Sequence, residues 1–322
     1  MIKVNNLTKI YRTPIKTNNF LQDLFARKYE EKKALNNISF EIGEDEFVGF
    51  VGPNGAGKTT TMKILSGILY PTSGNIEVLG FTPFEKRKEF LKQIGFVMGQ
   101  KNQLLWELPA IDSFQLAKEI YEVNDITYKK TLNNLIELLD AQKLVEQPLK
   151  TLSLGQRMRM ELIASLLHQP KILFLDEPTI GLDIFAQTTV RNFIKEYQRM
   201  YHATIILTSH YMQDVQKLTK RVILIDTGKI IFDGQLGDLK EEYSDEKTIT
   251  ITLERPEEKL PDLDFKYDYQ APLLKINLKK EKLNTILPEI LKKIDFSDLT
   301  IEDEPIEEII KNIFMRKKDS PS

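Results

Sequence analysis

The sequence predicts an α/β protein with a largely parallel sheet, followed by a smaller α+β unit. Three observations support this prediction. Apolar segments of strand length alternate with helical stretches, as in parallel sheets covered on both faces. A strand, a glycine-rich loop and a helix start follow one another between residues 46 and 69. Near residue 240 this alternation gives way to a charged, turn-like segment.

Composition narrows the class of protein. The chain has 322 residues, which favours about two domains, and its 41% hydrophobic and 29% charged content is typical of globular proteins. The net charge of -2 argues against nucleic acid as the main partner. The absence of cysteine excludes disulfides, zinc–thiolate sites and thiol chemistry. The start has no signal-peptide pattern, and no apolar run approaches the roughly 18 residues of a membrane helix.

Two domains are expected, residues 1–240 and 241–322. The first includes a helical subdomain at about 101–168 and an insertion at 12–34 that interrupts the strand pattern. The insertion carries one apolar side of a possible helix, formed by Phe20, Leu21, Leu24 and Phe25. It is either a docking element for a partner or membrane surface, or a surface insertion that packs on its own domain.

Periodicity places the remaining elements in order. Strands of the first domain are expected at 2–11, 37–42, 46–51, 75–79, 94–98, 172–176, 204–208, 222–226 and 229–232, with helices concentrated at 112–167. In the second domain, after a linker at 240–247, we expect strands at 248–253, 273–278 and 299–302, with helices at 283–294 and 307–314.

The loop before the first helix fits the Walker A pattern, a Gly, four residues, then Gly-Lys-Thr. Gly55 and Gly57 let successive N–H groups point inward, and the helix N-terminus adds positive potential. Lys58 can neutralise β/γ-phosphates, and the Thr59 hydroxyl can ligate Mg²⁺. A glycine-rich turn without a ligand is the weaker alternative. The predicted nucleotide-binding residues of this loop are Gly52, Pro53, Asn54, Gly55, Ala56, Gly57, Lys58, Thr59 and Thr60.

The segment from Lys171 to Pro178 has the form of a Walker B strand, an apolar run that ends in two carboxylates. Asp176 would hold Mg²⁺, directly or through water, and Glu177 would polarise the attacking water. Taken alone, such a pair could equally be a solvated turn.

The segment from Leu152 to Gln156 resembles the signature motif of ATP-binding cassette (ABC) ATPases, usually Leu-Ser-Gly-Gly-Gln. Here Leu154 stands at the third position. The resemblance implies a P-loop NTPase fold in which Ser153, Gly155 and Gln156 face the nucleotide held by the opposite subunit. Without that context, Ser153 would be a helix N-cap.

Other family elements occur in the expected order, so the resemblance covers about residues 2–240. It implies that Tyr11 stacks on adenine, Gln100 reaches Mg²⁺ and water, Asp183 lies in the D-loop and His210 contacts the γ-phosphate. Taken one at a time, these residues have simpler explanations. Tyr11 could pack in the core and Gln100 could have no role. Asp183 could be a helix N-cap, alone or in addition, and His210 could make a structural hydrogen bond. The catalytic residues implied are Glu177, His210, Lys58 and Gln100; the metal ligands implied are Thr59, Gln100 and Asp176.

A single Walker A and a single signature imply a head-to-tail homodimer closed by two Mg-ATP. The resemblance further implies ATP hydrolysis at the cytoplasmic face of the membrane, coupled to transport, with export as the expected direction, through a separate integral membrane permease. Leu105, Trp106 and Leu108 either line the permease groove or pack in the helical core. The alternative functions are a non-transport ABC ATPase of DNA repair or translation, or a ligand-sensing switch. Residues 241–322 would be a regulatory or dimer-stabilising domain.

Overall fold

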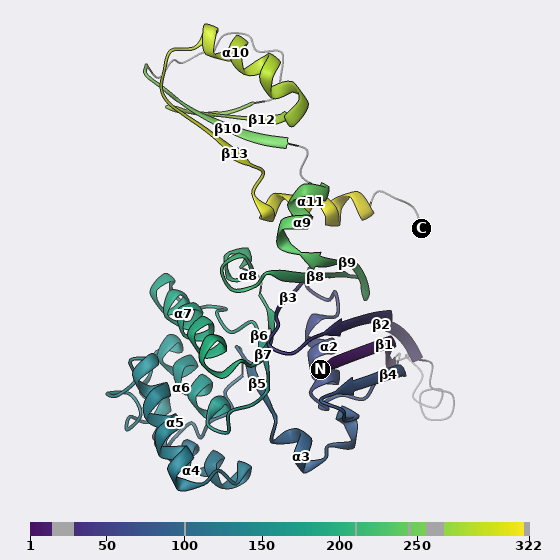
Figure 1. Cartoon of the computed structure of the whole chain (residues 1–322), viewed down its shortest axis with the longest axis vertical. Coiled ribbons are helices and arrows are strands. Elements are labelled where there is room, and N and C mark those ends of the chain that lie inside the picture. Colours follow the sequence, from purple (N-terminus) through teal and green to yellow (C-terminus); the bar gives the residue numbers. More distant parts are fainter. Residues whose placement is uncertain (15–28, 100, 210, 244–245, 256–266, 319–322) are drawn as a thin grey trace, which may run out of the picture. The chain divides into compact units, whose positions relative to one another are not determined.

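The computed structural model describes residues 1–14, 29–99, 101–209, 211–243, 246–255 and 267–318 (Figure 1). The chain divides into two compact units, Met1–Gly234 and Gln235–Ser322. Each unit contains its own buried apolar core. None of the helices in these ranges is long and apolar enough to cross a bilayer. The predicted α/β class is confirmed, with a mixed architecture described below.

The centre of the first unit is a six-stranded sheet with the order β5-β6-β7-β3-β8-β9. Its strands are β3 (Phe47–Val51), β5 (Ile94–Met98), β6 (Ile172–Asp176), β7 (Thr204–Thr208), β8 (Arg221–Asp226) and β9 (Lys229–Gln235). The first five run parallel, so their carboxyl ends share one edge. β9 follows β8 through a two-residue turn in which both Thr227 and Gly228 have positive φ, the conformation that tight hairpins favour.

A second, antiparallel sheet packs against this one. It contains β1 (Ile2–Pro14), β2 (Tyr29–Ile42) and β4 (Ser73–Val78) in the order β2-β1-β4. Between the two sheets lies a core that includes α2 (Lys58–Leu65). The expected cover on both faces of the parallel sheet is present, and on this face the antiparallel sheet supplies it together with α2.

Helices cover the other face, at the left of the first unit in Figure 1. They are α4 (Ala110–Tyr121), α5 (Asp125–Leu138), α6 (Leu154–Leu166) and α7 (Ile184–Tyr201). Alternate side chains of β6 serve the two cores: Leu173 and Leu175 face these helices, and Ile172 and Phe174 face α2. Among the described residues, the remaining helices of this unit are α3 (Lys88–Leu91) and α8 (Met212–Leu218), with single turns at Pro83–Glu85 and Leu149–Thr151.

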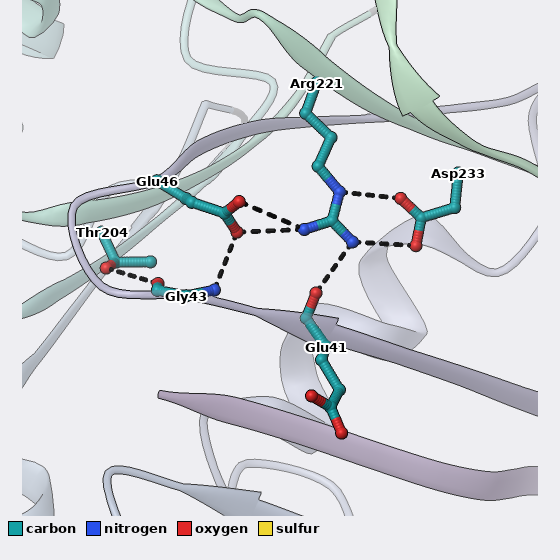
Figure 2. Close-up of polar contacts among 6 residues, drawn as sticks. All are labelled: Glu41, Gly43, Glu46, Thr204, Arg221 and Asp233. Carbon is teal, nitrogen blue, oxygen red and sulfur yellow. Dashed lines mark hydrogen bonds and ion pairs between the residues drawn. The ribbon is translucent and has the colours of Figure 1, made fainter.

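An arginine joins the two sheets at the amino ends of the parallel strands (Figure 2). The Arg221 guanidinium donates to Asp233 at 2.8 and 2.9 Å, to Glu46 at 3.0 Å and to the Glu41 carbonyl at 2.8 Å. These partners raise the pKa of Arg221, Asp233 contributing most. Glu46 also accepts from the Gly43 N–H at 2.7 Å, which fixes the turn before β3.

The insertion at 12–34 differs from its prediction. Residues 12–14 and 29–34 continue β1 and β2 as a paired ribbon, with Arg12 opposite Glu31 and their side chains 2.8 Å apart. The run of charged residues hides the strand pattern, because both faces of the ribbon are exposed. The possible helix at 20–25 lies outside the described residues.

In the described part of the second unit, a helix packs against a four-stranded sheet. The sheet has the order β11-β12-β10-β13, formed by β10 (Glu246–Leu253), β11 (Tyr267–Gln270), β12 (Leu273–Lys279) and β13 (Phe296–Asp303). The helices that the structure describes here are α9 (Leu236–Tyr243), α10 (Leu283–Lys293) and α11 (Ile306–Lys318), with a single turn at Lys280–Lys282. Alternate β10 residues pack with Ile290 of α10. The prediction of a linker at 240–247 was wrong, because α9 and β10 both extend into this segment. The helix α9 also buries Leu239.

Candidate active site

The Walker A loop is shaped by close backbone contacts. A side chain at Gly52 would place its Cβ 2.1 Å from the Ile225 carbonyl oxygen, and one at Gly57 would meet the Ala34 carbonyl at 2.8 Å. Gly57 also has a φ of 115°, which strongly favours glycine, and directly precedes α2. The loop therefore turns from a buried strand into a helix N-terminus, the arrangement that binds phosphate through backbone N–H groups.

Lys58 lies beneath this loop and holds it. Its Nζ donates to the carbonyl oxygens of Gly52 at 2.6 Å and Pro53 at 3.0 Å. The side chain is only 5% exposed, and burial lowers the pKa of Lys58, although Glu177 and Asp176 act in the opposite direction. The ammonium group thus lies where nearby anions stabilise its charge.

Two hydroxyls converge on Asp176 at the end of β6. Thr59 Oγ1 donates to Asp176 Oδ1 at 3.0 Å, and Thr208 Oγ1 donates to the same oxygen at 2.7 Å. Thr59 comes from the first turn of α2 and Thr208 from the end of β7. A hydroxyl and a carboxylate oxygen in contact are the hard donors that Mg²⁺ prefers, so these residues fit the ion.

Glu177 adopts an unusual backbone conformation beside Asp176. Its φ is 56°, in the left-handed region that costs a non-glycine residue roughly 1–2 kcal/mol. Its N–H donates to Thr208 Oγ1 and to the Thr208 carbonyl, both at 3.1 Å. Gly99 packs against it so closely that a Cβ there would lie 2.0 Å from the Glu177 carbonyl. The backbone is therefore fixed by two neighbouring strands.

The acidic residues share a pocket with the start of α2. Its lining residues are Thr59, Lys63, Met98, Gly99, Lys101, Asp176 and Glu177. The pocket thus combines a hydroxyl, two carboxylates and two lysines at the carboxyl edge of the sheet. Gln100 and His210 lie outside the described residues; the segments before them end at this edge with β5 and β7.

Tyr11 lies near the same helix end. Its hydroxyl is 3.4 Å from Thr60 Oγ1 on α2, and its ring is 38% exposed. Lys9 Nζ lies 5.3 Å from the ring centroid. The β1 strand thus brings a partly exposed aromatic ring to the first turn of the Walker helix.

The signature segment begins α6. Ser153 Oγ accepts from the Gln156 N–H at 3.3 Å, and Gln156 Oε1 accepts from the Ser153 N–H at 2.8 Å, a reciprocal capping box. Gly155 is closely packed, because a Cβ there would lie 2.7 Å from Ala186 Cβ. Leu154 fits as the first helical residue, its side chain directed toward Gly181.

Asp183 begins α7 next to this segment. Its Oδ1 accepts from the Ala186 N–H at 2.9 Å, so Asp183 is the N-cap of α7, and its predicted place in the D-loop stays a prediction beside this contact. The two helix starts adjoin through Gly155 and Ala186. α6 and α2 pack on opposite faces of the central sheet (Figure 1). The signature segment, at the start of α6, and the Walker A loop, at the start of α2, therefore belong to helices on different faces of the sheet.

Sequence reasoning missed Thr208. The hydroxyl of this threonine donates to the Asp176 carboxylate and accepts from the Glu177 N–H, so it helps to fix the positions of both acidic residues. One signal was present in the sequence: a polar residue at the end of an otherwise apolar buried strand requires a partner. Its partner could not be identified without the pairing of β6 with β7.

Comparison with known proteins agrees with this geometry. Residues 35–180 match the ABC transporter family. The ABC transporter ATP-binding protein NatA of Bacillus subtilis (strain 168) is 32% identical, over 67% of this chain and 89% of NatA. The energy-coupling factor transporter ATP-binding protein EcfA2 of Clostridium perfringens is 33% identical, over 75% of this chain and 82% of EcfA2. The solved dimeric ATP-binding cassette MJ0796 with ADP and Pi aligns at a TM-score of 0.61 and 24% identity, over 73% of this chain and 99% of that one.

The fold and the order of the motifs define an ABC-type nucleotide-binding domain, the ATPase module of this superfamily. The chain belongs to the ABC transporter ATP-binding proteins. It is accordingly an ATP-binding and ATP-hydrolysing transporter subunit.

Proposed function

We propose that this chain forms a head-to-tail homodimer around two Mg-ATP and hydrolyses them to power a separate membrane permease. The supporting observation is the cluster in which Thr59 from the Walker helix meets Asp176, with Glu177 next in the chain. The proposed location is the cytoplasmic face of the cell membrane, and the proposed direction is export.

The residues have distinct proposed roles in hydrolysis. Thr59 and Asp176 would hold Mg²⁺, with Gln100 as a further ligand. When bound, Mg²⁺ supplies positive charge that neutralises phosphate oxygens. The water oxygen bonds to the γ-phosphorus while the bond to the bridging oxygen breaks, and ADP leaves. Glu177 orients the water and accepts its proton, and Lys58 stabilises charge on the phosphates.

The dimer follows from the separation of the two phosphate-binding ends. The Walker A loop and the signature helix start belong to different layers, so one chain does not enclose a nucleotide with both. Beside Ser153, the side chains of Leu154, Ile184 and Phe185 are exposed, the last by 86%. Such an apolar surface next to a helix N-terminus is suited to cover by a second copy. Ser153 would then contact the nucleotide bound by the partner, and His210 would contact the nucleotide bound by its own chain.

The permease is proposed to contact the loop after Gln100. The side chains of Leu105, Trp106 and Leu108 are each about 40% exposed, which argues against core packing. Arg157 lies 4.9 Å from the Trp106 ring centroid. The base of this loop is held where the Gln103 N–H donates to Glu161 at 2.7 Å, and burial raises the pKa of Glu161 to about 7. The loop thus presents apolar side chains from a fixed base.

Changing this surface tests the permease proposal. We expect Leu108→Asp to reduce recovery of the permease with the ATPase by about tenfold, because a charge replaces a desolvated apolar contact. The chain is expressed with the membrane proteins encoded beside its gene, and pull-down yields are compared. The control is Ile126→Asp, which changes an exposed isoleucine on α5. Equal recovery with both variants would contradict the proposed contact.

A further inference from the structure

A buried carboxylate on α8 joins three segments of the first unit. Asp214 is 0% exposed, and its two oxygens accept three side-chain hydrogen bonds. Arg191 Nε donates to Oδ1 at 2.6 Å, while Thr179 Oγ1 and Ser209 Oγ donate to Oδ2 at 2.5 and 2.6 Å. All three donors are buried as well. A carboxylate in such a position is retained only when it is paired and hydrogen-bonded, so the three donors are held together.

The donors come from segments that the proposed site uses. Thr179 lies two residues after Glu177, on the turn that follows β6. Ser209 directly follows β7, whose last residue, Thr208, contacts Asp176. The same Ser209 hydroxyl oxygen accepts from the Tyr211 N–H at 3.0 Å. The carboxylate therefore joins the ends of two adjacent strands that carry the acidic residues.

The third donor extends the network to the start of α7. Arg191 Nη2 donates to Gln187 Oε1 at 2.7 Å, and Gln187 Nε2 donates to the Leu182 carbonyl at 3.1 Å. Leu182 immediately precedes Asp183, the N-cap of α7. A continuous path of hydrogen bonds thus runs from Asp214 to the turn that adjoins the signature helix start.

We propose that Asp214 is a positioning residue for ATP hydrolysis, which fixes the turn after Glu177 and the turn before Asp183 relative to the end of β7. This inference rests on the proposed function, because those two turns flank the proposed base and the proposed dimer contact. Asp214 touches no nucleotide in this account. Its removal displaces the reacting groups, and small displacements lower the rate of the chemical step more than they weaken binding.

The Arg221 cluster of Figure 2 provides the matched control. It too is an arginine with carboxylate partners, Asp233 and Glu46, and it joins several strands. It lies at the amino ends of β3 and β8, whereas the Walker A loop follows the carboxyl end of β3. A loss of stability there leaves the proposed catalytic edge intact, so Asp233→Asn reports what destabilisation alone does.

The experiment uses the full chain and separates binding from catalysis. The kcat for ATP is measured, together with the Kd of a fluorescent ATP analogue and the melting temperature. We expect Thr179→Val, which keeps the side-chain shape but removes one donor, to lower kcat about tenfold, and Asp214→Asn to lower it about 100-fold. The Kd stays within about twofold, and Thr179→Ser, which restores the hydroxyl, recovers most of the rate.

Two results would overturn the inference. One is a kcat for Thr179→Val equal to that of Asp233→Asn at a similar melting temperature; the other is failure of Thr179→Ser to recover the rate. If Asp214→Asn does not fold, the comparison of Thr179→Val with Thr179→Ser still decides. If the unmodified chain and its permease complex show no ATP turnover, that result counts against the proposed function. It is distinct from a failure of the Asp214 inference, which requires an active unmodified chain.

Discussion

Replacing Glu177 with glutamine is expected to lower ATP turnover by about 10²–10⁴-fold while ATP binding is retained. The amide cannot accept the proton of the attacking water. The backbone N–H bonds to Thr208 do not depend on the side chain, so the left-handed conformation at this residue should persist. ATP should therefore accumulate in the bound state, and the closed dimer should persist. Single-turnover hydrolysis and size-exclusion chromatography with ATP measure the two effects.

The matched control for this variant is Glu46→Gln, which makes the same chemical change at the opposite ends of the strands (Figure 2). Its turnover should remain near that of the unmodified chain. Rapid hydrolysis by Glu177→Gln would show that another group activates the water, and Glu177 would lose its proposed role.

Removing the Lys58 side chain should have the second-largest effect. We expect Lys58→Ala to lower turnover by about 10²–10³-fold, since a buried cation that meets developing phosphate charge is lost. ATP affinity should also fall by about tenfold or more, because charge-assisted hydrogen bonds to the phosphates disappear. The loop loses its two bonds to Nζ as well. Calorimetric titration with ATP and steady-state turnover distinguish the contributions.

Lys88→Ala is the control for charge alone. Lys88 is an exposed lysine on α3 that pairs with Glu122, and its loss should leave ATP affinity unchanged. Unchanged ATP affinity in Lys58→Ala would contradict the role of Lys58 as a phosphate ligand, even if turnover fell.

Much of the central sheet could be predicted from the sequence, because a strand buried on both faces is a continuous apolar run. This is why β3, β6 and β8 lie where expected. The ribbon of β1 and β2 could not be predicted beyond residue 11, since its charged residues face solvent on both sides and carry no alternation. α9 was missed because one buried leucine, Leu239, is too weak a periodic signal.

The site divides in the same way. The motif letters predicted that Thr59 and Asp176 act together, although 117 positions separate them in the sequence. Thr208 and Asp214 were beyond reach because their roles depend on which strands pair and on which buried groups need partners. Leu154 replaces the usual glycine of the signature, yet the capping box forms, and the nearby Gly181 leaves room for the larger side chain.

The central claim is that each nucleotide lies between two chains, and crosslinking tests it most directly. The chain has no native cysteine, so one thiol can be placed at each end. Asn54→Cys labels the Walker A loop and Ser153→Cys labels the signature, both at exposed positions, and each is made in the Glu177→Gln background. The two single-cysteine chains, one carrying a mass tag, are mixed with a short bis-maleimide.

The account predicts an ATP-dependent crosslink between tagged and untagged chains, absent without nucleotide and absent when either cysteine is omitted. A third chain carries both cysteines and is treated in the same way. If this chain becomes crosslinked only within itself, and the single-cysteine chains form no mixed dimer in the presence of ATP, the shared site is contradicted.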